Sequence, residues 1–174
     1  MLIETTRLRL RPWRTTDRDV FAAMNSDAEV MADEGGPLDR ASSDAKLKRY
    51  AAAFDRYGFG RWLVEGRDGA FLGYAGVMPS PSRHPLGDHV EIGWRFMRAA
   101  WGHGYATEAA RAALDDALGR VGLPEVLAYT AADNLRSQAV MERLRLRRDP
   151  TRDFTADYAT QKGWRGLVWV ARRG

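Results

Sequence analysis

The segment of the chain best suited to chemistry reads AAWGHGYATE, at residues 99–108, where a strand-like run meets a helical run. A helix start leaves backbone N–H groups without partners, and the helix dipole makes that end favourable for an anion. Gly102 and Gly104 let the backbone come close to a ligand, because glycine carries no Cβ atom. The segment therefore predicts a cradle for a pyrophosphate group.

Two common phosphate loops do not fit this segment. A Walker loop needs a lysine after its last glycine, and none follows Gly104. The dinucleotide fingerprint needs a third glycine at the position where Thr107 stands. The remaining pattern, R/Q-x-x-G-x-G/A, is that of an acyl-CoA loop, although Ala99 occupies its first position.

With the wording W-G-x-G-Y-A-T-E-A at residues 101–109, the segment resembles the GNAT superfamily of acyl-CoA N-acyltransferases, in the branch that acetylates ribosomal-protein N-termini. The run N-L-R-S at residues 134–137 resembles the N-x-x-S of the same family, thirty residues after Gly104. That separation fits one helix and one strand, so a βαβ unit is expected. The resemblance covers nearly the whole chain, with its specific motifs confined to about residues 88–146.

The resemblance implies an α/β (α+β) GNAT fold, with a mixed, mostly antiparallel central sheet of about seven strands, splayed at its middle strands, and helices on both faces. The pattern of the chain is consistent with one domain over residues 1–174. Strands are expected at 3–13, 61–66, 71–78, 88–97, 126–131, 154–158 and 167–171. Helices are expected from Thr15 or Thr16 to 31, from Ser42 or Ser43 to 57, and at 105–121 and 134–144, with a loop at 79–87.

Composition excludes several other classes of protein. The chain has no cysteine, which rules out disulfides, thiolate metal sites and cysteine nucleophiles, and its three scattered histidines give no reason to expect a metal. No signal peptide and no membrane-length apolar run is visible, so a cytoplasmic protein without a membrane partner is expected. The net charge of +4 is not the footprint of a nucleic-acid-binding protein. A monomer or a homodimer is expected.

The resemblance implies an N-acetyltransferase with acetyl-CoA as co-substrate, which passes the acetyl group to a primary amine by direct attack in a ternary complex. An α-amine, with a pKa near ~8, is mostly protonated at neutral pH, so a nearby carboxylate is needed to hold the ammonium and accept its proton. Glu91 is the expected carboxylate, and a structural ion pair with Arg95 or another cation is the alternative. Ser137 is the expected partner of the leaving sulfur, and an ordinary residue of the first helical turn is the alternative.

The expected cofactor contacts include the family motifs and two backbone groups that could stabilise an oxyanion, at Phe96 and Met97. The full set is Phe96, Met97, Trp101, Gly102, His103, Gly104, Tyr105, Ala106, Thr107, Asn134, Ser137, Met141 and Arg143. Two further positions depart from the family pattern. Met141 stands where the family often has a tyrosine, and Arg145 replaces the glycine of L-G-F, so a different turn is expected there.

Charge is unevenly distributed along the chain. Residues 27–44 carry a net charge of −5 and residues 143–152 a net charge of +4. The acidic segment predicts a cationic acceptor, such as a basic peptide N-terminus or a polyamine, and the basic segment could meet phosphates. Two solvated surfaces are the alternative. The competing function is an acyl-CoA-binding GNAT module with little or no turnover.

Overall fold

The computed structural model describes residues 1–81 and 83–173, so Ser82 of the expected loop 79–87 lies outside the described residues. The strands are β1 (Ile3–Glu4), β2 (Leu8–Arg11), β3 (Arg61–Gly66), β4 (Phe71–Pro79), β5 (Val90–Phe96), β6 (Glu125–Thr130), β7 (Arg147–Arg148), β8 (Phe154–Ala156) and β9 (Trp164–Arg172). The α-helices are α1 (Arg18–Asn25), α2 (Arg40–Tyr57), α3 (Tyr105–Leu118) and α4 (Leu135–Arg143).

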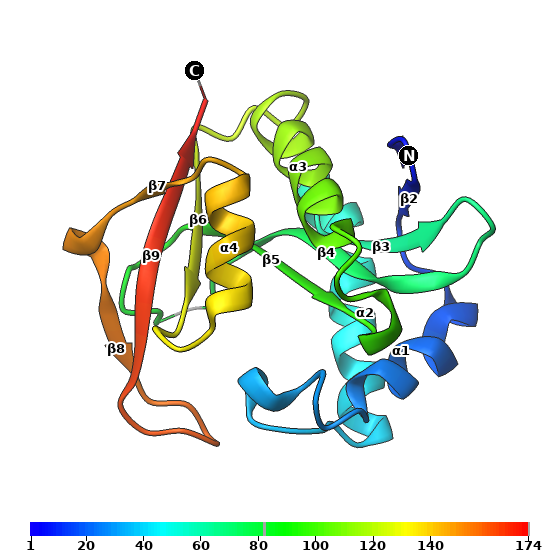
Figure 1. The fold of residues 1–174 in the computed structure, drawn as a ribbon, viewed down its shortest axis with the longest axis horizontal. Coiled ribbons are helices and arrows are strands. Elements are labelled where there is room, and N and C mark those ends of the chain that lie inside the picture. Colours follow the sequence, from blue (N-terminus) through cyan, green and yellow to red (C-terminus); the bar gives the residue numbers. More distant parts are fainter. Residues whose placement is uncertain (82, 174) are drawn as a thin grey trace.

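The strands form a mixed sheet in the order β1-β2-β3-β4-β5-β6-β9-β7, with β8 paired to β9 (Figure 1). Every pairing is antiparallel except that of β5 with β6. The fold class is therefore the expected one, with nine strands in the described chain instead of about seven. The difference arises because the first strand breaks into β1 and β2 around Thr5, whose backbone N–H bonds to the carbonyl of Leu8, and because β7 adds a short edge strand.

Helices cover both faces of the sheet because its strands alternate apolar side chains between the faces. On β4, Ala75 and Val77 pack in the cores that include α3, whereas Tyr74 and Met78 pack in the core that includes α1 and α2. Within the described chain, no helix is both long enough and apolar enough to pass through a membrane.

Two of the helix boundaries that differ from the expected ones are the C-terminal end of α1 and the N-cap of α2. The helix expected to reach residue 31 ends at Asn25, and a short 3₁₀ turn follows at Ala32–Glu34. Asp39, and neither expected serine, caps α2, since its Oδ1 accepts from the backbone N–H of Ser42 at 2.7 Å. Helix α2 ends at Tyr57, as predicted, with Gly58 as its C-cap.

The sheet splits between β5 and β6. These strands pair at a single position, Glu91 with Leu127, and then diverge toward their C-terminal ends (Figure 1). The expected splay is thus present, and within the described chain it leaves the second half of β5 without a neighbouring strand on one side.

Candidate active site

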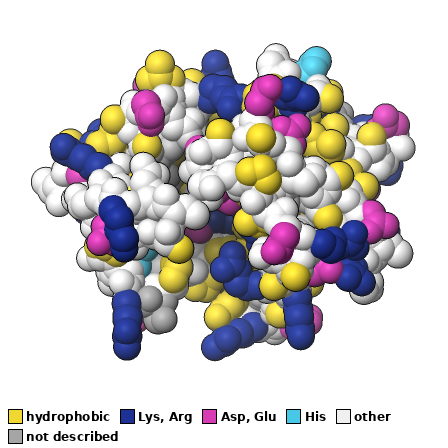
Figure 2. Space-filling view, turned by 90° about the horizontal axis from the view of Figure 1, so that it is seen from below, with side chains coloured by type: hydrophobic (Ala, Val, Ile, Leu, Met, Phe, Trp, Pro, Cys, Tyr) yellow, Lys and Arg dark blue, Asp and Glu magenta, His cyan; other side chains and the backbone are white. Residues whose placement is uncertain are grey.

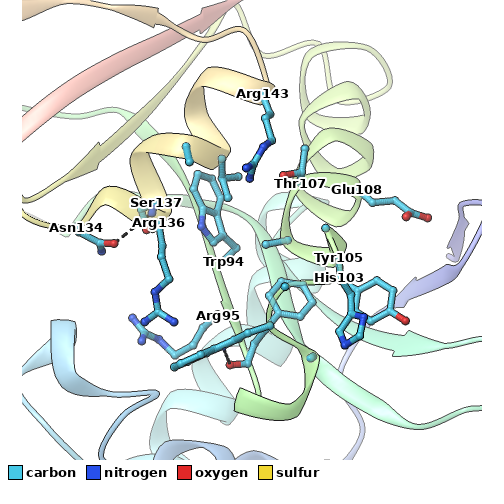
Figure 3. A pocket seen from close by; sticks show the side chains of 18 of the residues that line it. Trp94, Arg95, His103, Tyr105, Thr107, Glu108, Asn134, Arg136, Ser137 and Arg143 are labelled. Carbon is cyan, nitrogen blue, oxygen red and sulfur yellow. Dashed lines mark hydrogen bonds between the residues drawn. The ribbon is translucent and has the colours of Figure 1, made fainter.

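A cavity of about 940 Å³ lies at the split. The end of β5, the loop and first two turns of α3, residues along the whole length of α4, and Val30 and Asp33 line it (Figure 3). Trp94 and Arg95 both contribute, although neighbouring residues of a strand point to opposite faces. The cavity therefore passes from one face of the sheet to the other, and the molecule is hollowed where it opens (Figure 2).

The loop before α3 has the geometry of an anion cradle. Gly102 and Gly104 adopt left-handed conformations, with φ of 80° and 76°, which other residues adopt only with strain. In the described chain, the backbone N–H groups from Gly102 to Thr107 make no hydrogen bond, and the buried Thr107 Oγ1 also lacks a partner there. These unsatisfied donors at a helix start fit a pyrophosphate group.

Arg7 braces this loop from the N-terminal part of the chain. Its Nη1 donates to the carbonyl of His103 at 2.8 Å, its Nε donates to Glu108 Oε2 at 2.7 Å, and its guanidinium lies 4.7 Å from the ring centre of Tyr105. Despite partial burial, hydrogen bonds from Thr5 and Arg7 hold the pKa of Glu108 below its usual range. No local sequence signal marks Arg7, because its role comes from a contact between segments far apart in the chain.

The open edge of β5 presents backbone groups to the cavity. The N–H of Met97 donates to the carbonyl of Leu72 at 2.8 Å, so it is not the free oxyanion donor that we expected. In an antiparallel pair, successive residues direct their backbone groups to alternate sides. The N–H groups of Trp94 and Phe96 therefore point toward the split, while the carbonyl of Phe96 accepts from Trp101 Nε1 at 3.0 Å.

Helix α4 supplies the opposite wall (Figure 3). Asn134 caps it, accepting from the backbone N–H of Ser137 at 3.1 Å, and its Nδ2 donates to Asp33 Oδ2 at 3.3 Å. The guanidinium of Arg136 stacks 3.8 Å from the ring centre of Trp101, which joins α4 to the loop across the cavity.

The structure brings most of the predicted cofactor contacts together. The predicted residues that line the cavity are Phe96, Trp101, Gly102, His103, Gly104, Tyr105, Ala106, Thr107, Asn134, Ser137 and Arg143. The other two predicted contacts, Met97 and Met141, are not among the described residues that line the cavity. Met141 is buried in the core between α4 and the sheet, and Met97 packs against the core beneath α1 and α2.

Glu91 also lies outside the lining, on the face of β5 opposite Ile92. Its carboxylate pairs with Arg61 of β3. The side chain of Arg61 extends across β4 on the same face of the sheet and also donates to the carbonyl of Gly76. A Cβ atom at Gly93 would stand 2.8 Å from Arg61 Nη2, so glycine makes room for this crossing. The ion pair is the alternative that the sequence left open for Glu91, and its catalytic role stays a prediction.

The turn after α4 corrects one expectation. Arg145 adopts the left-handed conformation that a glycine would take, with φ of 59°. Its N–H donates to the carbonyl of Glu142 at 2.8 Å, and the N–H of Leu146 donates to the carbonyl of Met141 at 3.1 Å. This is the hydrogen-bond pattern of the Schellman motif, so the turn is the usual one with an arginine in the strained position.

The model of the GNAT acetyltransferase domain matches residues 7–147 of this chain. A curated relative, the FsC-acetyl coenzyme A-N(2)-transacetylase of Aspergillus fumigatus, is 32% identical over 149 residues, which are 80% of this chain and 62% of the relative. The match to another curated relative likewise spans only 64% of that protein's length.

Solved structures share the fold over almost the whole chain. An acetyltransferase from Agrobacterium tumefaciens is 27% identical, with a TM-score of 0.80, over 99% of this chain and 94% of its own. The ribosomal L7/L12 α-N-protein acetyltransferase RimL, in complex with coenzyme A, has a TM-score of 0.79 at 13% identity, over 99% of this chain and 98% of its own, and so resembles it in fold. With the family model matched over most of its length, the chain belongs to the GNAT acetyltransferase family.

Proposed function

We propose that this protein is an acetyl-CoA-dependent N-acetyltransferase that acetylates a primary amine, of a protein N-terminus or a small molecule, by direct attack in a ternary complex. The observation that carries the proposal is the cavity at the split in the sheet, because the anion cradle lines one part of it and residues on the α1–α2 side, Arg95 and Asp33, line another. A cofactor and an acceptor can then approach the same point from two sides.

The described residues fit acetyl-CoA in two ways. The N–H groups from Gly102 to Thr107, with Arg143 opposite, suit the pyrophosphate, and the open edge of β5 suits the amide groups of the pantetheine arm. When bound, acetyl-CoA supplies an acetyl thioester. The N–H of Phe96 is then the group best placed to stabilise an oxyanion, since it points into the split.

Proton transfer needs two further groups. Glu91 is our candidate for receiving the proton of the ammonium through water, since its carboxylate is held by Arg61 near the point where the strands part. Ser137, on the cavity wall, is our candidate for donating a proton to the leaving thiolate. The acceptor is proposed to be cationic, and its KM should then rise with salt.

Thiol release tests the proposal directly. The protein is mixed with acetyl-CoA and a panel of free-N-terminus peptides, polyamines and other primary amines, and free CoA is measured with a thiol reagent. We expect amine-dependent release of CoA and an acetylated product by mass spectrometry. CoA binding by calorimetry without release for any amine would support the competing function, a CoA-binding module.

A further inference from the structure

Three carboxylates lie on the α1–α2 face of the sheet or in the segment that covers it, and each pairs with a buried cation. The pairs are Asp33–Arg95, at 2.6 Å, Glu34–Lys46, at 2.7 Å, and Glu91–Arg61. The carboxylates are 46%, 40% and 19% exposed, whereas their cations are 9%, 11% and 7% exposed. The pairs are therefore oriented alike, with the negative group nearer the solvent and the positive group behind it.

This orientation makes the face locally acidic although its formal charges balance. A charge near the surface meets a ligand more closely than one buried behind it, and the energy between two charges falls with their separation. The carboxylate of Glu34 is also held in its ionised form. Burial alone would raise the pKa of Glu34, but Arg95 and Lys46 lower it to about 2.

Asp33 differs from the other two carboxylates because it lines the cavity. Arg95 Nη1 donates to its Oδ1 at 2.6 Å, and Asn134 Nδ2 donates to its Oδ2 at 3.3 Å, so both oxygens are fixed in place. An ionised carboxylate can accept about four hydrogen bonds, and these two contacts leave room for more. The group is thus fixed and partly exposed in the cavity, beside Asn134 at the start of α4, on the wall opposite the cradle.

Most other carboxylates of the acidic segment are occupied elsewhere. Asp27 and Glu29 pair with Arg98 on the surface, and Asp44 pairs with Arg18 and Arg40. Their side chains are absent from the described lining of the cavity. The net charge of residues 27–44 is therefore a weaker guide to the acceptor than the position of Asp33, the carboxylate of this segment that lines the cavity.

We propose that Asp33 binds the ammonium group of the acceptor and so selects protonated primary amines. This inference rests on the proposed acetyl transfer, since it places the acceptor amine at the cavity wall opposite the phosphate cradle. Asp33 is then a substrate-binding residue that α4 and β5 position together, through Asn134 and Arg95.

The test compares Asp33→Asn with Glu29→Gln, a matched loss of charge on the same segment outside the cavity. Loss of a hydrogen bond to a charged group corresponds to a rise of roughly tenfold or more in the KM for the amine. We expect that rise for Asp33→Asn, with the KM for acetyl-CoA unchanged, and wild-type constants for Glu29→Gln. An unchanged amine KM in Asp33→Asn, with folding verified by thermal unfolding, overturns the inference.

A binding experiment separates this inference from the proposed reaction. Spermidine is titrated by calorimetry into the CoA-loaded wild type, Asp33→Asn and Arg136→Gln. Weaker binding in Asp33→Asn alone supports the inference, even if no variant turns over and the proposed acetyl transfer fails. Equal binding by wild type and Asp33→Asn overturns the inference. An acceptor that binds through an anionic group would instead depend on Arg136, which forms no ion pair with any described residue and stacks on Trp101. A loss confined to Arg136→Gln overturns the inference as well.

Discussion

Replacing Gly104 by valine should distinguish the effect of backbone strain on stability from the effect of the cradle on CoA binding. Gly104 caps α3 with φ of 76°, and a Cβ atom there would meet, among the described residues, only Arg7, at 3.6 Å, so the main cost is conformational. A β-branched residue held in this region costs roughly 1–3 kcal/mol. At about 2–4 °C per kcal/mol for a chain of this size, the cofactor-free protein should melt about 2–12 °C lower.

The effect on CoA should exceed this loss of stability. If valine leaves the left-handed region, the N–H groups that follow Gly104 no longer point together at the pyrophosphate. The loss of one charge-assisted hydrogen bond, roughly 1.5–3 kcal/mol, would weaken CoA binding by about 10- to 100-fold. Calorimetric titration of CoA into the folded variant measures this change.

Gly58→Val is the matched control. Gly58 is the C-cap of α2, with φ of 74° and no described atom within 4 Å of its Cβ position, so it bears the same strain away from the cavity. We expect a similar fall in melting temperature and an unchanged CoA affinity. Equal CoA affinities for Gly104→Val and wild type, or equal losses in both variants, would refute the cradle assignment.

Three further changes test other parts of the structure. Arg145→Gly should raise the free energy of unfolding by about 0.5–1 kcal/mol, because relief of left-handed strain exceeds the entropy cost of glycine; a lower midpoint in urea would contradict this. The pKa of Glu34, lowered from 4.5 to about 2, implies stability that is present above about pH 4.5 and lost as the pH falls toward 2. With solvent screening of this part-exposed group, about 1–2 kcal/mol should be lost, and Glu34→Gln should flatten the acid limb of the unfolding curve. Glu91→Gln should lower kcat/KM for the amine by roughly 10²-fold with CoA affinity unchanged, whereas an equal loss of CoA binding would indicate a structural partner of Arg61.

Local patterns predicted the parts of the site that local chemistry determines. The spacing of Gly102 and Gly104 before a helix was enough to predict the cradle, and the place of Asn134 before a helix was enough to predict its role as a cap. The order of strands and helices followed from alternation and helical spacing. At Arg145 the family pattern misled, because the Schellman hydrogen bonds form even with a strained residue.

Residues whose roles depend on tertiary contacts could not be predicted in the same way. Arg7 reaches the cradle from the N-terminal strands, and Arg61 reaches Glu91 across β4. The sequence showed that the segment around Asp33 is acidic, but not which of its carboxylates faces the cavity. Such contacts depend on how strands and loops pack in three dimensions, and a single sequence does not show directly which distant residues come into contact.

The split between β5 and β6 also bears on solubility. An unpaired strand edge is a template for other chains and a common origin of aggregation. Here the unpaired half of β5 lies inside the molecule, between the loop before α3 and helix α4, and not on its outer rim. A second polypeptide would have to enter between those walls to add a strand. The fold can thus leave this strand edge open to a ligand while preventing other copies of the chain from pairing with it.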